Sequence, residues 1–138
     1  SVWRGAKVAK GRTRWQATAW EAAKQARRAR VPEVGELLTT RSLTRWVRET
    51  TQTGGVVLVL HEEAAAPIGG VRLPDPDDRE RPMVAVIVGP EGGISPGESE
   101  ALAGAGAALV GVGPTVLRSS TAGAVALALV LAAAGQYR

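Results

Sequence analysis

The hydrophobic positions in the first third of the chain recur with the spacing of a helix. Between Arg12 and about Arg30, apolar residues follow one another at steps of three and four, namely Trp15, Ala19, Ala22, Ala23 and Ala26. This spacing predicts a helix that ends at Val31-Pro32, because a proline disfavours helical backbone in the residue before it. Two early glycines predict an irregular stretch over residues 1–11.

Apolar runs in the rest of the chain predict strands. The first two, Val56–Leu60 and Met83–Val88, are unbroken and are typical of parallel strands buried on both faces. A third strand is predicted at Ala107–Val112. Residues 67–82, between the first two strands, are rich in proline, glycine and aspartate, which predicts an exposed loop.

Helices are predicted before, between and after these strands. One is expected over residues 41–51, with an apolar side made by Leu43, Trp46 and Val47. A capping box with proline at the first helical position, Ser95-Pro96-Gly97-Glu98, predicts the next helix. Ser119 or Ser120 can cap a last helix that ends near Gly135. Strands alternating with helices indicate an α/β fold, with a mainly parallel sheet flanked by helices.

Length and composition restrict the chemistry. A chain of 138 residues can form one domain with its own core. It contains no cysteine, which excludes disulfides, thiolate zinc sites and a cysteine nucleophile. His61 is the single histidine, so we expect neither a catalytic triad nor a multi-histidine metal centre, and no bound metal.

The chain shows no targeting or membrane segment. Its first residues are basic and lack the apolar core of a signal peptide. The longest apolar run, Ala122–Ala134, is mostly alanine and is shorter than the roughly twenty residues that a membrane span needs. We expect a cytoplasmic protein, and the first residue, Ser1 in place of methionine, indicates part of a longer protein.

Basic residues are concentrated in the first third. Residues 1–48 carry twelve Lys or Arg against three acids, whereas residues 49–138 carry five against ten. Such a patch favours phosphate backbones, although a solvated helix face explains the charge equally well. Trp3 could stack on an unpaired base, while Trp15 and Trp46 are expected to be packed. The candidate RNA-binding residues are Arg4, Lys7, Lys10, Arg12, Arg14, Lys24, Arg27 and Arg28.

Three predicted strand ends are candidates for a ligand site. In parallel α/β sheets, ligands bind beyond the carboxyl ends of the strands, here Leu60-His61-Glu62, Gly89–Gly93 and Gly113–Arg118. Two of these ends are glycine-rich, so main-chain groups can approach a ligand closely. The spacing excludes a Walker loop and the dinucleotide-binding fingerprint. Plain turns remain the alternative interpretation.

Four segments resemble a known family in the same order along the chain. Upstream are Glu21-Ala22-Ala23-Lys24-Gln25, Arg28 and Val31-Pro32-Glu33, followed by Leu60-His61-Glu62-Glu63-Ala64. The two loop motifs are Gly89-Pro90-Glu91-Gly92-Gly93-Ile94-Ser95 and Val116-Leu117-Arg118-Ser119-Ser120-Thr121-Ala122. Together they resemble the RsmE family, which are 16S ribosomal RNA uracil-N3 methyltransferases of the SPOUT class.

This resemblance implies that residues 1–138 form a SPOUT domain that binds S-adenosylmethionine (SAM) and has a trefoil knot at its carboxyl end. The last helix would pass through the knot with its small residues Ala122, Gly123, Ala124, Ala126 and Ala128, although an ordinary buried helix has the same pattern. The implied cofactor-binding residues are Leu60, His61, Gly89, Pro90, Glu91, Gly92, Gly93, Val112, Gly113, Val116, Leu117, Arg118, Ser119, Thr121 and Ala122. A homodimer is also implied, which could bury Val125, Leu127, Leu129 and Leu131.

The implied reaction moves a methyl group from a sulfonium to N3 of a uridine in 16S ribosomal RNA. N3 carries a proton at neutral pH, which has to leave before or during the attack. Arg118 is too basic to be a general base, so it is expected to bind a phosphate or to stabilise negative charge on the uracil. Glu91 could take the proton or orient the uracil, or it could merely bond nearby loop amides. His61 is a second candidate for the proton acceptor.

The chain departs from the family pattern in three ways. Ser120 stands where the family has glutamate, and Thr115 stands where an arginine is common. If either position supports the uracil or fixes Arg118, activity or substrate choice differs. The family's amino-terminal PUA-like RNA-binding barrel and its first catalytic strand and helix have no counterpart here, so we expect a fragment that captures the ribosome poorly. The alternative functions are a SPOUT ribose 2′-O-methyltransferase and a non-catalytic RNA-binding module.

Overall fold

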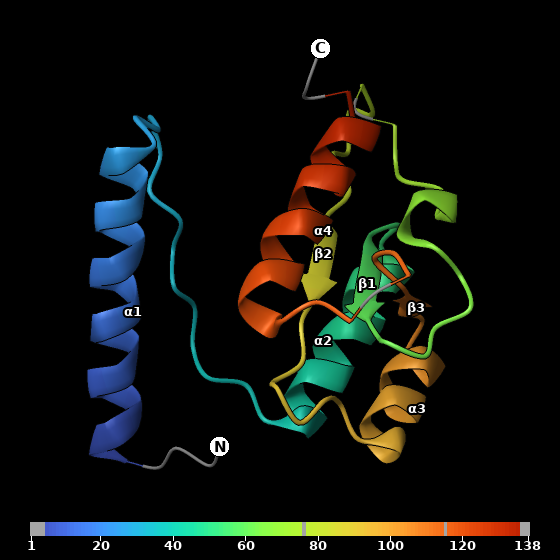
Figure 1. The fold of residues 1–138 in the computed structure, drawn as a ribbon, viewed down its shortest axis with the longest axis horizontal. Coiled ribbons are helices and arrows are strands. Elements are labelled where there is room, and N and C mark those ends of the chain that lie inside the picture. The colour runs from blue at the N-terminus through green and yellow to red at the C-terminus, as the bar shows by residue number, and fades with distance from the viewer. Residues whose placement is uncertain (1–4, 76, 115, 136–138) are drawn as a thin grey trace. The chain divides into compact units, whose positions relative to one another are not determined.

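The computed structural model of the chain describes residues 5–75, 77–114 and 116–135 (Figure 1). The chain divides into two compact units, Ser1–Thr39 and Thr40–Arg138. Trp3, Arg4, Thr115 and Tyr137 lie outside the described residues. The first unit contains one helix, and the second contains the sheet and every other helix of the described part.

The first unit consists of helix α1, Ala6–Gln25, and an extended segment after it. Gln16 holds this segment from the middle of the helix. Its side-chain amide donates to the carbonyl of Pro32 at 3.0 Å and accepts from the N–H of Val34 at 2.8 Å. Arg12 Nε donates to the Val34 carbonyl at 3.0 Å. Polar side chains therefore join the two parts of this unit.

The predicted bounds of this helix are wrong at both ends. It begins six residues earlier than Arg12, because strong helix formers surround Gly11 and offset its cost of about 1 kcal/mol. It ends at Gln25, since Arg27 adopts a left-handed conformation with φ of 50°. The N–H groups of Arg27 and Arg28 then bond to the carbonyls of Lys24 and Ala23, which is the hydrogen-bond pattern of a Schellman motif. The termination is therefore made without glycine or proline.

The second unit is built on three parallel strands, β1 (Val56–Leu60), β2 (Val84–Ile87) and β3 (Ala108–Val110). Their order is β2-β1-β3, with Val56 opposite Val84 and Leu58 opposite Ala108. The predicted strands and their parallel direction are confirmed. Only the central strand has fully buried residues in its middle, whereas β2 is half-buried along its length. The expectation that Met83–Val88 is buried on both faces is confirmed only in part: the side chains of Val84–Ile87 pack alternately against the two faces, whereas Met83 and Val88 are exposed.

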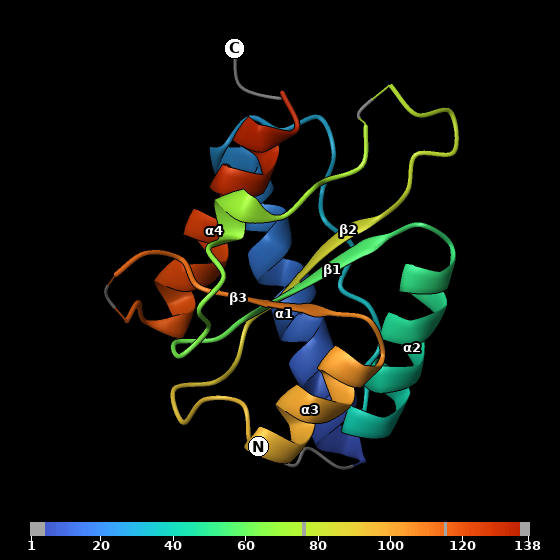
Figure 2. The ribbon, with the colours of Figure 1, turned by 90° about the vertical axis from the view of Figure 1, so that its right-hand side faces the viewer.

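Helices cover both faces of the sheet. Helices α2 (Thr40–Gln52) and α3 (Pro96–Gly104) pack on the face that receives Val57 and Val59. Helix α4 (Ser119–Ala133) and the short 3₁₀ helix η1 (Ile68–Gly70) pack on the other face, where β1 places Leu58. The alternation of β1 side chains thus divides the core into two clusters, and Figure 2 shows the helices on the two sides of the sheet. The predicted α/β class is confirmed.

Of the two predicted helix caps in this unit, the one at the start of α3 is confirmed. Ser95 and Glu98 form the capping box of α3, with Pro96 at the first helical position. Glu98 also accepts a hydrogen bond from Thr40 Oγ1 at 3.0 Å, which links α3 to the start of α2. The predicted cap of α4 by Ser119 or Ser120 is wrong, because Arg118 is the N-cap residue, its side chain makes no capping hydrogen bond, and Ser119 is already the first helical residue.

The segment over residues 67–82 differs from the predicted exposed loop. Ile68 is buried and belongs to the core cluster beneath α4. Its N–H donates to the Gly111 carbonyl at 2.9 Å, and the Gly111 N–H donates to the Ala66 carbonyl at 2.9 Å. One apolar residue among prolines and glycines therefore anchors the start of this segment to the chain after β3.

No helix among the described residues has the length and apolar character to cross a bilayer.

Candidate active site at the carboxyl ends of the strands

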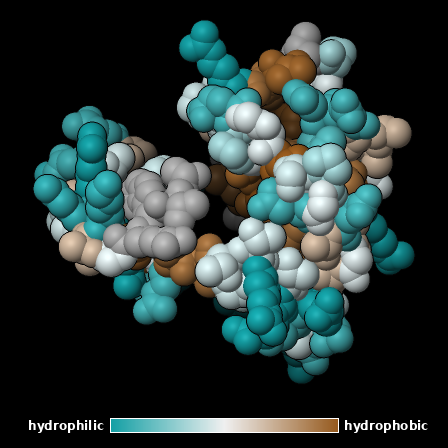
Figure 3. Space-filling view, turned by 90° about the horizontal axis from the view of Figure 1, so that it is seen from below, coloured by the Kyte–Doolittle hydropathy of each residue, from teal (hydrophilic) through white to brown (hydrophobic). Residues whose placement is uncertain are grey.

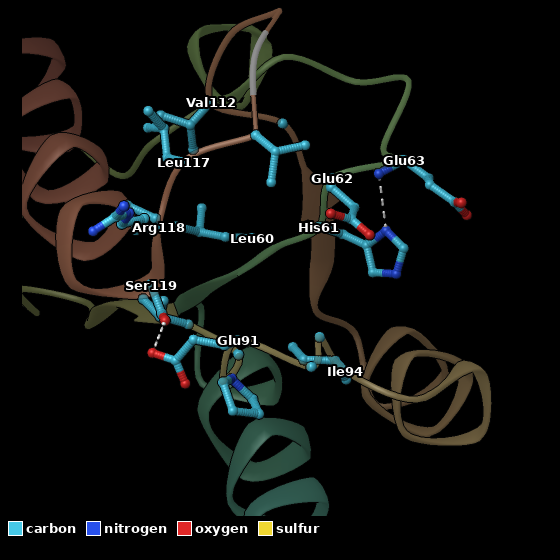
Figure 4. A pocket seen from close by; sticks show the side chains of 18 of the residues that line it. Leu60, His61, Glu62, Glu63, Glu91, Ile94, Val112, Leu117, Arg118 and Ser119 are labelled. Atoms are coloured by element: carbon cyan, nitrogen blue, oxygen red, sulfur yellow. Dashed lines mark hydrogen bonds between the residues drawn. The ribbon is translucent and has the colours of Figure 1, made fainter.

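The segments that follow the three parallel strands surround one cavity of about 580 Å³ (Figure 4). This volume lies in the range of roughly 300–1,000 Å³ that is usual for small-molecule sites. The structure brings nearly all predicted cofactor-binding residues to its wall, namely Leu60, His61, Gly89, Pro90, Glu91, Gly92, Gly93, Val112, Gly113, Val116, Leu117, Arg118, Ser119 and Ala122.

Thr121 is the exception among the predicted residues. It is exposed in the first turn of α4 and does not line the cavity. The reason is the helical period, because Ser119 and Ala122 are three residues apart and share the face toward the cavity. Thr121 lies on a different side of the same turn.

Several lining residues were absent from the predicted set. They are Glu62, Glu63, Val88, Ile94, Pro96, Gly111 and Pro114. Four of them, Glu62, Glu63, Ile94 and Pro114, lie inside the segments singled out in the sequence, and Val88 and Pro96 lie next to predicted segments. Gly111 is less obvious. A Cβ at this position would lie 3.3 Å from the carbonyl oxygen of Ala64, so glycine permits the close approach of the two chain segments.

Two glycines give the wall its main-chain character. Gly93 and Gly113 have φ of +77° and +112°, in the region that side chains disfavour. No atom lies within 4 Å of the place where their Cβ would be. Both glycines therefore present bare backbone to open space in the cavity-lining loops.

Glu91 and Ser119 connect two of the three loops. Ser119 Oγ donates to Glu91 Oε1 at 2.8 Å, and the two side chains face each other in the close view (Figure 4). The backbone N–H of Glu91 itself and the Ser119 hydroxyl both stabilise the carboxylate and hold the pKa of Glu91 below its ordinary value. A carboxylate with a lowered pKa is ionised at neutral pH and is a weaker proton acceptor than an ordinary glutamate.

Arg118 and His61 lie on opposite sides of the cavity (Figure 4). Within the described residues the Arg118 guanidinium is exposed and has neither a hydrogen bond nor an ion pair, so it can receive an anionic group. His61 Nδ1 accepts a hydrogen bond from the N–H of Glu63 at 3.2 Å. When the ring is neutral, its proton is therefore on Nε2, and the ring presents a donor there.

The candidate RNA-binding residues belong to the first unit. Lys7, Lys10, Arg12, Arg14 and Lys24 lie on α1, and Arg27 and Arg28 follow its end, whereas Arg4 lies outside the described residues. All described members are exposed, and hydrophilic side chains dominate the visible face of this unit (Figure 3). Lys24 pairs with Glu21 at 3.4 Å.

The packing expected for Trp15 is wrong in this unit, since 63% of its surface is exposed. Among the described residues of this unit, α1 has beside it an extended segment to which polar side chains bond. Trp46, by contrast, packs against the core cluster beneath α2, as predicted.

The chain is similar to known RNA methyltransferases. Residues 1–131 match the family model described as RNA methyltransferase domain. The ribosomal RNA small subunit methyltransferases E of Mycobacterium bovis and Mycobacterium tuberculosis are each 50% identical to the chain over 128 residues, which is 93% of this chain and 47% of theirs. The chain thus spans about half the length of the curated relatives it matches.

Solved structures resemble the chain over nearly all of its length. A Legionella pneumophila methyltransferase in complex with SAM has 30% identity and a TM-score of 0.74, over 96% of this chain and 50% of that one. The ribosomal RNA small subunit methyltransferase E of Neisseria gonorrhoeae, bound to SAM, has 26% identity and a TM-score of 0.73, over 95% and 52%. Since the family model covers almost the whole chain, the protein belongs to the RNA methyltransferase domain family.

Proposed function

We propose that this chain carries the cofactor pocket and the catalytic residues of a SAM-dependent methyltransferase that methylates N3 of a uridine in 16S ribosomal RNA of the small subunit. One observation carries the proposal: a single cavity gathers both loop motifs at the carboxyl ends of the parallel strands. The names of the relatives support the ribosomal substrate, and the SAM-bound neighbours support the cofactor.

The residues present fit SAM. The bare backbone at Gly93 and Gly113 can bond the polar edges of an adenosyl group, while Leu60 and Leu117 supply apolar contact. When bound, SAM supplies a methyl group activated by a sulfonium sulfur. The protein's main task is then to hold the donor and the uracil in contact, and proximity supplies much of the rate.

The geometry favours different roles for the two catalytic candidates. The unpaired Arg118 can stabilise the negative charge that develops on the uracil carbonyls, or bind a neighbouring phosphate. Glu91 is ionised and weakly basic, so it is better suited to accept a hydrogen bond from the uracil N3–H and to orient the ring. Its bond to Ser119 leaves Glu91 Oε2 for this contact.

We propose that the chain is knotted at its carboxyl end. The chain segment after β3 bonds to the segment before η1 through Gly111 and Ala66, and α4 then packs against both η1 and β2. These contacts support the proposal because a trefoil would need the last helix to pass through the loop that includes the segment from β1 to β2. The proposed metal-free homodimer would bury the exposed Leu127 and Leu129 of α4.

The exposed basic residues of the first unit are proposed to contact the RNA backbone. Their charge suits phosphate and their side chains are exposed, although Arg12 also bonds to the Val34 carbonyl and Lys24 pairs with Glu21. A ribosomal RNA substrate would also place the protein in the cytoplasm.

The test is a methylation assay with labelled SAM and small-subunit RNA, followed by digestion to nucleosides. The proposal predicts label in 3-methyluridine. Label in a 2′-O-methylated nucleoside would assign the chain to ribose methylation instead. RNA binding without any transfer of label would support a non-catalytic RNA-binding module.

A further inference from the structure

One side-chain hydrogen bond joins two cavity loops that are far apart in the sequence. Ser119 Oγ and Glu91 Oε1 lie 2.8 Å apart, although the two residues are separated by 28 positions. Glu91 belongs to the loop after β2, and Ser119 is the first residue of α4 after the loop from β3. We call this pair the Glu91–Ser119 clasp.

The strand order shows what the clasp holds. Strands β2 and β3 lie on opposite sides of β1, so the loops that follow them start on opposite sides of the central strand. The chain after β3 has to cross the end of β1 before Ser119 can reach Glu91. This crossing segment carries Leu117 and Arg118, both of which line the cavity (Figure 4). The clasp therefore fixes the crossing segment at its far end.

The first turn of α4 explains why the carboxylate of Glu91 is held beside Ser119. Arg118 is the N-cap residue and provides no side-chain cap, and the first turn of α4 contains no acidic residue. A helix N-terminus without a cap favours a nearby negative charge. Glu91 supplies one from another loop, and its lowered pKa agrees with this arrangement.

The end of the loop that contains Glu91 is anchored by Ile94, which packs against a core cluster, whereas the glycines beside Glu91 have no such contact. Glycines follow Glu91 at positions 92 and 93, and no neighbouring atom lies near the Cβ position of either. Within this loop the N–H of Gly93 bonds back to the carbonyl of Pro90 at 2.8 Å, which closes a local turn but does not tie it to another element. A link from a rigid helix thus has a large effect on where this loop lies.

We propose that Ser119 is a positioning residue for methyl transfer, whose hydroxyl holds Glu91 and the glycine loop against the crossing segment and so keeps the SAM cavity assembled. This inference rests on the proposed methyltransferase function. Ser119 acts through Glu91 and does not itself touch the reacting atoms. Removing its hydroxyl should loosen the wall of the cavity and leave Arg118 in place.

The clasp can be tested in the ligand-free chain by following the carboxyl carbon of Glu91 in a carbon-13 NMR titration. Ser119→Ala should raise the pKa of Glu91 toward its ordinary value, because the carboxylate loses a donor. Ser119→Thr should keep it low, since the hydroxyl is retained. Ser120→Ala is the matched control, as Ser120 is exposed on the next position and has no hydrogen bond in the described structure. This control should leave the titration of Glu91 unchanged.

The same variants are then titrated with SAM in a calorimeter and assayed for methyl transfer across a range of pH. Loss of one hydrogen bond to an exposed carboxylate should weaken SAM binding about three- to tenfold in Ser119→Ala, with recovery in Ser119→Thr. The low-pH limb of the rate profile should move to higher pH in Ser119→Ala. In Ser119→Thr it should lie at the same pH as in the wild type.

The two experiments separate the clasp from the proposed function. An unchanged titration of Glu91 in Ser119→Ala, or equal losses of SAM affinity in Ser119→Ala and Ser119→Thr, would overturn the inference. If the carboxyl titration responds as expected but the wild-type chain binds no SAM, the clasp exists and the role in methyl transfer is overturned together with the proposed function.

Discussion

The two units of the chain use opposite means of holding themselves together. The Thr40–Arg138 unit has two apolar clusters on either side of a central strand, with Leu58, Val59 and Val110 fully buried. The Ser1–Thr39 unit has one buried apolar residue among those described, Ala23, and depends on polar bonds from Gln16 and Arg12. The cavity belongs to the unit with the core, and the basic surface belongs to the other. Rigid packing thus supports the site that requires exact geometry.

Truncating one apolar side chain in each unit tests whether only the Thr40–Arg138 unit depends on apolar packing. Leu58→Ala removes a fully buried side chain from the central strand, so we expect a loss of about 2–5 kcal/mol in the free energy of unfolding. Trp15→Ala removes a larger but exposed side chain and should change it by less than about 0.5 kcal/mol. Chemical denaturation followed by circular dichroism measures both. Equal losses in the free energy of unfolding for the two variants would contradict the exposed position of Trp15.

A pair of arginine truncations separates the chemical roles of the two units. Arg118→Ala should lower the rate of methyl transfer at saturating RNA by about 100-fold, because a charge-stabilising group is lost. Arg14→Ala on α1 should raise the KM for RNA and leave that rate unchanged, because a phosphate contact contributes to binding only. Steady-state kinetics at fixed salt distinguishes the two. A large fall in SAM affinity for Arg118→Ala would instead make Arg118 a cofactor-binding or folding residue.

A pair of glycine substitutions tests how tightly the α/β unit is packed. Gly106 has φ of +106°, and a Cβ there would lie 2.7 Å from Thr51 Oγ1. Gly106→Ala should therefore cost about 1–3 kcal/mol of stability. Gly104→Ala, at the last residue of α3 and in open space, should stabilise by about 0.4–1 kcal/mol. Thermal melts compare the two variants, and equal melting temperatures would contradict the described packing.

The smallest expected effect concerns the pH dependence of the same unit. Hydrogen bonds from Ser95 and Thr40 lower the pKa of Glu98 below its ordinary value of 4.5. Because the folded value is the lower one, this contribution to stability is present above pH 4.5 and is lost as the pH falls through the folded pKa. Glu98→Gln should flatten the acid side of the stability profile, whereas Glu100→Gln on the same helix should preserve it. Identical acid limbs for wild type and Glu98→Gln would show that the bonds do not form in solution.

The sequence predicts the α/β unit well because its signals are local or periodic. The apolar run at Val56–Leu60 and the capping box at Ser95 each determine an element without help from distant residues. The end of α1 could not be predicted, because the residue with the left-handed conformation is Arg27 and not a glycine. The burial of Ile68 could not be predicted either. Its N–H bonds to the carbonyl of Gly111, which lies more than forty positions away in the sequence.

The same distinction applies to the site. The loop motifs identify almost the entire wall of the cavity, because parallel strands place their carboxyl ends at one edge. The partners within the site were not predictable from spacing. The bond from Ser119 to Glu91, and the bond from Glu63 to His61 that sets the imidazole tautomer, require the path of the chain across the sheet end. Thr121 lies off the cavity wall for a local reason, since the turn of α4 directs Ser119 and Ala122 toward the cavity.

The most direct test of the central claim is a calorimetric titration of the chain with SAM, paired with thermal melts at the same concentrations. The claim that the three strand-end loops form a cofactor pocket predicts saturable heat with one site per chain. It also predicts a rise in melting temperature with SAM concentration, equivalent to about 2.7 kcal/mol at one hundred times Kd. A folded chain that gives no heat and an unchanged melting temperature would contradict it.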